Sequence, residues 1–527
     1  MGIEDGKFSR SAQENELAFI LRQNRNFVYK FSRFLTIMIQ LFITPRYRFI
    51  PIAMGVIAVS LGSLADSSAE KVSITQKKSN KTLKIEVLNL SEDSLTFKLA
   101  NGKKFTVNTD TLTADSLKKL RTHMTPAATD YGAINKSIGH ALFEGSTLWN
   151  QLTAEVAKRL KWPKESSTDQ SSSYRYYTSE VYQFLGAHPY CATLYGGAGG
   201  KATHLSLVYA NKGDFGSAAG FAEDHFKKIH PGTKPPGSLN EAIKLDALLI
   251  NESLTASLGE PEKQYYGEKE DKRKVLRWNK GEHAFLLSEI EDEYTSLLIV
   301  SKDNADKQGK VAFVKDSDLK KLVVKNVVKE ANGDTLIKNI PMVDQGPKGY
   351  CAPATFERAM RYMLVPADMY LLATAATQVG GGTNTTKLAD SCKRIVRSKA
   401  RRIKDLDLEK DLKIRRVKQY IDKGVPILWQ MRSLQSYNKI ANERTKQRAS
   451  VADFSEWSTT IAAEAEKVIP VMENNETNHH ICMIIGYNEE TNEIAVSDSW
   501  GARYELRWIH LDIAKAVTSR GGFVIDL

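Results

Sequence analysis

The sequence predicts an α+β protein with several domains. The chain has 527 residues, 42% of them apolar, which is enough for about three globular domains of ordinary composition. Short runs near the N-terminus alternate polar and apolar residues, which is typical of half-buried strands. The C-terminal third begins with helical patterns and ends with apolar runs typical of buried strands. We therefore expect a small β module, a mixed middle region and a C-terminal domain with a helical half and a sheet half.

Residues 1–69 are predicted to be a signal peptide or a membrane-anchor region. Two apolar runs, residues 34–43 and 49–65, are accompanied by basic residues, and the second run ends in Ser-Leu-Ala, a pattern typical of exported chains. This predicts an extracytoplasmic protein (periplasmic, secreted or membrane-anchored) that begins near Asp66 or Glu70. The long polar leader is unusual for a signal peptide, so a start at Met38 or a retained anchor stays open. Neither run has the ~18 uninterrupted apolar residues of a membrane-spanning helix.

Residues 70–125 are predicted to form a small β module. Alternating runs at 72–75, 83–87, 94–99 and 104–107 are separated by turn residues, and Asn101-Gly102 is a strong hairpin signal. Thr113 is expected to cap a helix that follows the last strand. In strand count and turn placement, residues 70–121 resemble small SH3-like barrels. The resemblance implies a binding or spacing role.

Residues 126–305 are predicted to be a mixed α+β domain without an assigned role, and residues 306–335 a charged linker. Helical patterns and apolar strand-like runs alternate through the domain, and Pro-Gly punctuation divides it. The expected helices are 150–160 and 217–229, and the expected strands are 202–209, 275–278, 284–289 and 295–300.

The predicted C-terminal domain, residues 336–527, begins with a pattern suited to thiol chemistry. Gln345 stands in a glycine- and proline-rich turn, and Cys351 follows it at the start of a helical run. A helix N-terminus lowers the pKa of a thiol because its unpaired N–H groups and its dipole favour an anion. A side-chain amide such as that of Gln345 could donate to the oxyanion formed when a thiolate attacks an amide.

A base for Cys351 is predicted from a hairpin far along the chain. His480 opens an apolar strand that ends in Gly486-Tyr487, and Asp498 follows the short strand 494–496. Such a hairpin can bring the carboxylate of Asp498 to the imidazole of His480 and fix its orientation. Further helices are expected at 370–378, 387–398 and 417–423, and a buried strand at 425–430.

Residues 336–527 resemble papain-like cysteine peptidases in three features. These are the order of Gln, Cys, His and Asp along the chain, the spacing His-x5-Gly-Tyr and the sequence Asp-Ser-Trp-Gly. The Gln-Gly-x4-Cys-x-Pro-Ala start, the aspartate and the glycine loop at 380–383 are most similar to bacterial peptidases related to those that cut double-glycine leader peptides of bacteriocins. The resemblance implies a papain-like fold and a protein or peptide substrate. It assigns Cys351 as nucleophile, His480 as base and acid, Asp498 as orienting acceptor and Gln345 as oxyanion donor.

Several alternatives stay open. His479 is a rival base, although strand alternation turns it to the face opposite His480. Leader peptidases of this type usually carry glycine where this chain has Ala352, which keeps open a non-catalytic surface binding or structural protein with a degenerate domain. A transglutaminase-like acyl transferase is a third possibility.

Composition and spacing argue against other classes of function. The formal net charge of +12 is moderate for this length, and the basic cluster between residues 393 and 404 lacks interleaved aromatics, so no nucleic-acid partner is predicted. The spacing of cysteine, histidine and aspartate fits no common zinc pattern, so neither a metal nor a cofactor is predicted. Four cysteines are too few for a disulfide framework.

Overall fold

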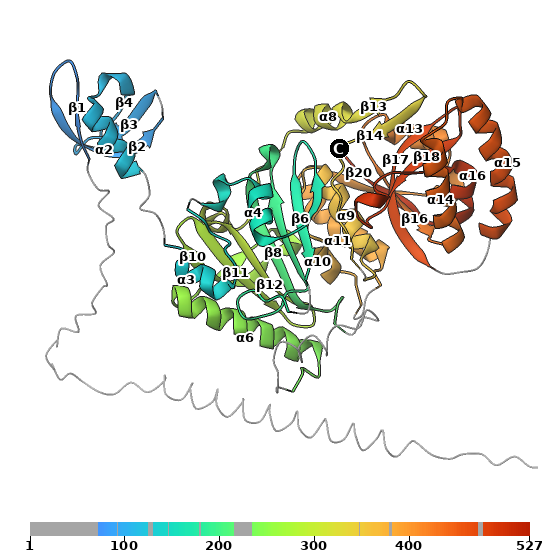
Figure 1. Ribbon diagram of the computed structural model, residues 1–527, viewed down its shortest axis with the longest axis horizontal. Helices are drawn as coiled ribbons and strands as arrows, with labels where there is room; N and C mark the ends of the chain where they lie inside the picture. The colour runs from blue at the N-terminus through green and yellow to red at the C-terminus, as the bar shows by residue number, and fades with distance from the viewer. Residues whose placement is uncertain are drawn as a thin grey trace, which may run out of the picture. The chain divides into compact units, whose positions relative to one another are not determined.

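The computed structural model describes residues 72–527, except for residues 92, 125–129, 146, 179–180, 216–233, 313, 347, 379–381 and 473–477. The chain divides into two compact units, Met1–Arg121 and Thr122–Leu527 (Figure 1). The predicted signal or anchor region, 1–69, and the predicted helix 217–229 lie outside the described residues. Within the described part of the chain, no helix is both long and apolar enough to cross a membrane.

The first unit contains a four-stranded antiparallel sheet whose strands pair in chain order, β1-β2-β3-β4. Alternation along β3 buries Leu95 and Phe97, and Gly102 turns the chain into β4 with a φ of +81°. Thr113 Oγ1 accepts a hydrogen bond from the Ser116 N–H at 3.3 Å, which confirms the predicted helix cap. The strands lie where alternation predicted them, whereas the SH3-like closure stays a prediction. The bounds are β1 (Val72–Thr75), β2 (Thr82–Leu90), β3 (Ser94–Lys98), β4 (Lys104–Asn108) and α2 (Ala114–Met124).

The middle region is built on one antiparallel sheet of eight strands, called the middle sheet, in the order β5-β6-β7-β8-β12-β11-β10-β9. Helix α6 lies along one face of it (Figure 1). The helix begins after Ser238, whose hydroxyl accepts the N–H of Glu241, and it buries Ile250 and Leu254 in a core shared with Phe285 of the sheet. The expected strands correspond to β8, β10, β11 and β12. The bounds are α3 (Gly132–Ile138), α4 (Thr153–Leu160), β5 (Lys164–Ser167), β6 (Ser172–Tyr177), β7 (Cys191–Gly196), β8 (Ala202–Asn211), α6 (Leu239–Leu258), β9 (Glu262–Tyr266), β10 (Arg273–Lys280), β11 (His283–Ile290), β12 (Tyr294–Ser301) and α7 (Lys302–Asp306).

The segment predicted as a linker, residues 306–335, is folded structure. It holds α8 (Asp316–Lys325), β13 (Val327–Lys329) and the start of β14 (Asp334–Ile337). Strand β13 pairs with β14, and β14 pairs with β17 of the C-terminal sheet. The expectation of a linker is corrected here: the charged residues of α8 form an exposed face, while Leu319 and Val323 on its other face are buried.

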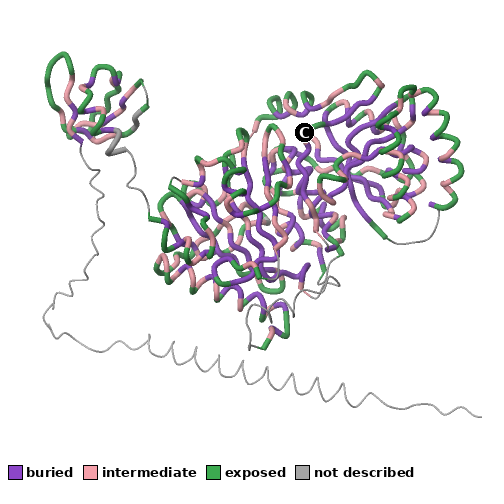
Figure 2. Tube along the Cα trace, viewed as in Figure 1, coloured by how far each residue is buried: buried purple, intermediate pink, exposed green. Residues whose placement is uncertain are grey.

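The C-terminal region contains a third antiparallel sheet, ordered β13-β14-β17-β16-β20-β15, with β18 paired to β17 and β19. Helix α9 packs against β16 and β17 and is buried along nearly its whole length (Figure 2). The expected helices overlap α10, α11 and α13, and the expected strand overlaps β16. The bounds are α9 (Cys351–Tyr362), α10 (Met369–Thr374), α11 (Thr385–Ser398), β15 (Arg402–Leu406), α12 (Leu408–Asp411), α13 (Ile414–Ile421), β16 (Ile427–Arg432), α14 (Gln435–Arg448), α15 (Phe454–Met472), β17 (His479–Asn488), β18 (Glu493–Ser497), β19 (Arg507–His510), α16 (Leu511–Val517) and β20 (Thr518–Asp526).

Candidate active site

Cys351 is the first residue of α9, where the sequence placed it, and its side chain is partly exposed. Burial alone would raise the pKa of this thiol. The hydrogen bond to His480, the positive charge of that imidazole, and the backbone N–H groups of Ile481 and Ala352 outweigh burial and hold the pKa of Cys351 below its ordinary value. The site therefore favours a thiolate.

His480 and Asp498 meet at one end of the β17–β18 hairpin. Strand β17 begins at His479, and Asp498 directly follows β18, so antiparallel pairing brings the two side chains together. His480 Nε2 donates to Asp498 Oδ1 at 3.0 Å, which leaves Nδ1 for the thiol. Burial lowers the pKa of His480, but the hydrogen bonds to Asp498 and Cys351 raise it to about 9. The opposite shifts of thiol and imidazole favour a thiolate–imidazolium pair.

Two further side chains hold the imidazole and the carboxylate. Trp500 stacks on the His480 ring, with ring centroids 4.6 Å apart. Arg507, on β19, donates to Asp498 Oδ2 from Nε at 3.1 Å and from Nη2 at 2.5 Å. Burial would raise the pKa of Asp498, but the hydrogen bond from His480 and the charge of Arg507 keep it below its ordinary value. Arg507 was not predicted from the sequence, because only the pairing of β19 with β18 brings it beside Asp498.

Gln345 lies beside the same hairpin. Its backbone N–H donates to the Ser499 carbonyl at 2.9 Å, and its side-chain Nε2 donates to the Lys348 carbonyl at 3.1 Å. An amide nitrogen carries two N–H groups, so one donor remains after the bond to Lys348. Its Oε1 is buried without a hydrogen-bond partner among the described residues.

Residues 337–516 match the model of the Peptidase_C39 like family. The matched range includes all four residues singled out in the sequence, and the mixed α+β fold around them is consistent with a papain-like cysteine peptidase domain. No curated protein matches the chain. Residues 336–527 are called the peptidase-like domain from here on.

Two side chains of α9 fasten the helix of the peptidase-like domain to its hairpin. Thr355 Oγ1 donates to the Ile481 carbonyl at 3.1 Å, and Arg358 Nη2 donates to Ser497 Oγ at 2.5 Å. These residues follow Cys351 by four and seven positions and so share its helix face. They fix the position of Cys351 relative to β17. Helical spacing from the cysteine places them on its face of the helix, but the sequence does not indicate which groups of the hairpin they meet.

The rival base His479 does not belong to this hydrogen-bonded cluster. His479 is exposed, and its pKa is lowered by partial burial and by the positive charges of Arg520 and Arg432. Cys482, on the same strand as His480, is buried, and burial raises the pKa of its thiol. Among the described residues, no group of three or more histidine, cysteine, aspartate or glutamate side chains could hold a metal ion.

Proposed function

We propose that this chain is an exported cysteine endopeptidase that hydrolyses peptide bonds, with Cys351 as its nucleophile. The observation that carries the proposal is the continuous chain of hydrogen bonds from the Cys351 thiol through the His480 imidazole to the Asp498 carboxylate. The family match over residues 337–516 supports a peptide or protein as the substrate. Export rests on the N-terminal sequence pattern alone.

The first half of the proposed reaction is acylation. The Cys351 thiolate attacks the carbonyl carbon of the scissile peptide bond, and the carbonyl π electrons move onto the oxygen. The backbone N–H of Cys351, in the first turn of α9, and the remaining amide N–H of Gln345 donate to this oxyanion. The His480 imidazolium then protonates the leaving amine, the C–N bond breaks and a thioester remains.

Hydrolysis of the thioester completes the cycle. Neutral His480 accepts a proton from a water molecule as its oxygen attacks the thioester carbon, and the C–S bond breaks to release the acid and the thiolate. Asp498 keeps Nε2 of the imidazole protonated and Nδ1 directed at the reacting atoms. Replacing Asp498 should therefore weaken turnover less than replacing Cys351 or His480.

The test compares cysteine variants of the full chain. Cys351→Ala and His480→Ala should abolish cleavage of a fluorogenic peptide library and leave the circular dichroism spectrum unchanged. Cys392→Ala is the matched control, because that cysteine is buried in α11 and is outside the cluster. Full activity in Cys351→Ala would refute the assignment.

Alkylation by iodoacetamide tests the ion pair without a substrate. An ordinary thiol with a pKa of about 8.5 is only about 0.3% thiolate at pH 6, whereas Cys351 should still react at this pH. In His480→Ala, alkylation of Cys351 should require more alkaline pH. An ordinary thiol titration of Cys351 in the wild type would instead favour a non-catalytic protein.

Incorporation of an added amine in place of hydrolysis would favour a transglutaminase-like transferase.

A further inference from the structure

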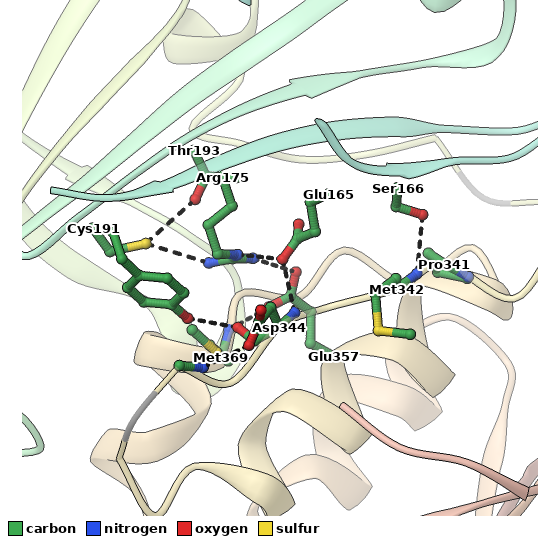
Figure 3. Close-up of polar contacts among 12 residues, drawn as sticks. Glu165, Ser166, Arg175, Cys191, Thr193, Pro341, Met342, Asp344, Glu357 and Met369 are labelled. Carbon is green, nitrogen blue, oxygen red and sulfur yellow. Dashed lines mark hydrogen bonds and ion pairs between the residues drawn. The ribbon is translucent and has the colours of Figure 1, made fainter. Parts of the chain in front are cut away.

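The segment before Cys351 contacts the middle sheet at alternate residues. We call residues 342–346 and 348–350 the pre-cysteine segment. The Met342 N–H donates to Ser166 Oγ and the Asp344 N–H donates to Glu165 Oε1, each at 2.9 Å. The carbonyl of Asp344 accepts the Tyr177 hydroxyl at 2.5 Å. Figure 3 shows Glu165 and Ser166 of the middle sheet facing Asp344 and Met342.

The same alternation continues at Lys348, whose side chain is 1% exposed. Its ammonium donates to both carboxylate oxygens of Asp214 at 2.8 Å, and also to the Tyr370 hydroxyl. Asp214 follows β8 of the middle sheet, whereas Lys348 belongs to the peptidase-like domain. Next to this pair, a Cβ atom on Gly213 would lie 2.0 Å from the Tyr350 hydroxyl oxygen, so only glycine fits there. The two parts of the chain are closely fitted at this point.

Lys348 connects this contact to the predicted oxyanion donor. Its carbonyl oxygen accepts Nε2 of Gln345 at 3.1 Å. The backbone N–H of Gln345 donates to Ser499 on the other side, next to Asp498. Gln345 is thus held between the hairpin that carries the imidazole and a lysine that is anchored to the middle sheet.

A buried ion network fixes the middle sheet against the helix that bears Cys351. Arg175 of β6 pairs with Glu165 at 2.5 Å and with Glu357 of α9 at 3.6 Å (Figure 3). Glu357 also accepts the Tyr195 hydroxyl at 3.2 Å and the Met369 N–H at 2.8 Å. Buried charges are costly unless they are paired. Separation of the two parts would take Arg175 and the Tyr195 hydroxyl away from the buried Glu357, so these contacts favour one fixed arrangement of sheet and helix.

We propose that the middle sheet is a working part of the peptidase, in which Asp214 is a positioning residue that holds Lys348 and, through its carbonyl, the Gln345 amide. The inference rests on the proposed function of the Cys351 site. Asp214 acts through Lys348 and is outside the set of groups that touch the reacting atoms. Without Asp214, Lys348 would be a buried ammonium lacking its counter-charge, and the pre-cysteine segment would move to let it reach water.

Asp214→Asn in the full chain tests the proposal, with Asp303→Asn as the matched control. Asp303 is an exposed aspartate in α7 of the middle region. It pairs with Lys307, the residue that directly follows this helix. Asp214→Asn should speed hydrogen exchange in the pre-cysteine segment. It should also weaken the adduct of the peptide aldehyde acetyl-Leu-Gly-glycinal about 10- to 100-fold, because the hemithioacetal oxygen needs the oxyanion donors. Alkylation of Cys351 by iodoacetamide needs no such donor and should change less than about twofold.

Asp214→Glu, which keeps the charge, should restore part of the aldehyde affinity. Unchanged hydrogen exchange in Asp214→Asn would overturn the proposal. Faster exchange with unchanged aldehyde affinity would also overturn it, because the segment would then be held without positioning the donor. If the wild type forms no aldehyde adduct and cleaves no peptide, the proposed peptidase function fails, and the positioning role fails with it. An active wild type with an unaffected Asp214→Asn variant rejects only the positioning role.

Discussion

Arg507 is predicted to hold the buried charge of Asp498, and Arg507→Met removes all of its donors at similar volume. The arginine gives two hydrogen bonds to Asp498 Oδ2, at 3.1 and 2.5 Å, and the two side chains are 3% and 1% exposed. In this variant the buried carboxylate of Asp498 has lost the arginine and keeps its hydrogen bond to His480. Removing one member of such a pair costs about 3–5 kcal/mol. We expect the free energy of unfolding to fall by about this amount in urea titrations.

Two comparison variants make the prediction sharper. Arg503→Met removes an exposed arginine that lies over the same Tyr504 ring as Arg507 and should change stability by under about 1 kcal/mol. Asp498→Asn combined with Arg507→Met also removes the buried charge that has lost its arginine, and it should be more stable than Arg507→Met alone. If Arg507→Met loses no more stability than Arg503→Met, the buried pairing of Asp498 is refuted.

Three other predictions concern the oxyanion donor, the imidazole and the N-terminus. Gln345→Ala should lower kcat about 10²–10³-fold if Gln345 donates to the oxyanion. The control Gln378→Ala replaces an exposed glutamine and should leave kcat unchanged. Equal kcat values for the two variants would contradict the role of Gln345. The pKa of His480 is raised to about 9, so its interactions add stability that is full below about pH 6.5 and is lost as pH rises through about 9. Unfolding free energies should show this loss in the wild type and a smaller one in His480→Gln; equal losses would rule the interaction out. N-terminal sequencing of native protein should find a start near Asp66 or Glu70, and an intact Met1 would contradict the predicted export signal.

The residues that carry the proposed chemistry could be selected from the sequence, whereas the residues that hold them could not. Cys351, His480 and Asp498 stand in distinctive local patterns at a helix start and around a hairpin. Arg507 and Arg358 meet their partners only through strand pairing and helix packing. An isolated arginine in a sequence carries no sign of the carboxylate or hydroxyl that it will meet.

The fold was predictable where apolar alternation or an apolar run marks a segment in the sequence. Strands β1 to β4, β8 and β10 to β12 have this pattern, and the helix expected at 387–398 overlaps α11. Strand β6 was not expected, because its sequence SSYRYY lacks apolar alternation. Its buried Arg175 gains partners from the peptidase-like domain, so the reason for its burial lies far away in the chain. The prediction of a linker was wrong for a similar reason. The exposed face of α8 is charged, whereas its buried face packs into the core of the peptidase-like domain.

The four cysteines of the chain show how environment alone separates a reactive thiol from inert ones. Burial raises the pKa of Cys191, Cys392 and Cys482, and at Cys191 this holds even though the positive charges of Arg175 and Lys348 lower it. A nearby cation is therefore not enough to produce a thiolate. Cys351 differs because two influences lower the pKa of its partly exposed thiol together. They are the hydrogen bond and charge of the His480 imidazole, and the backbone N–H groups that face the sulfur. Selective alkylation should follow this combination, and preferential labelling of Cys191 would mean that charge alone decides reactivity in this protein.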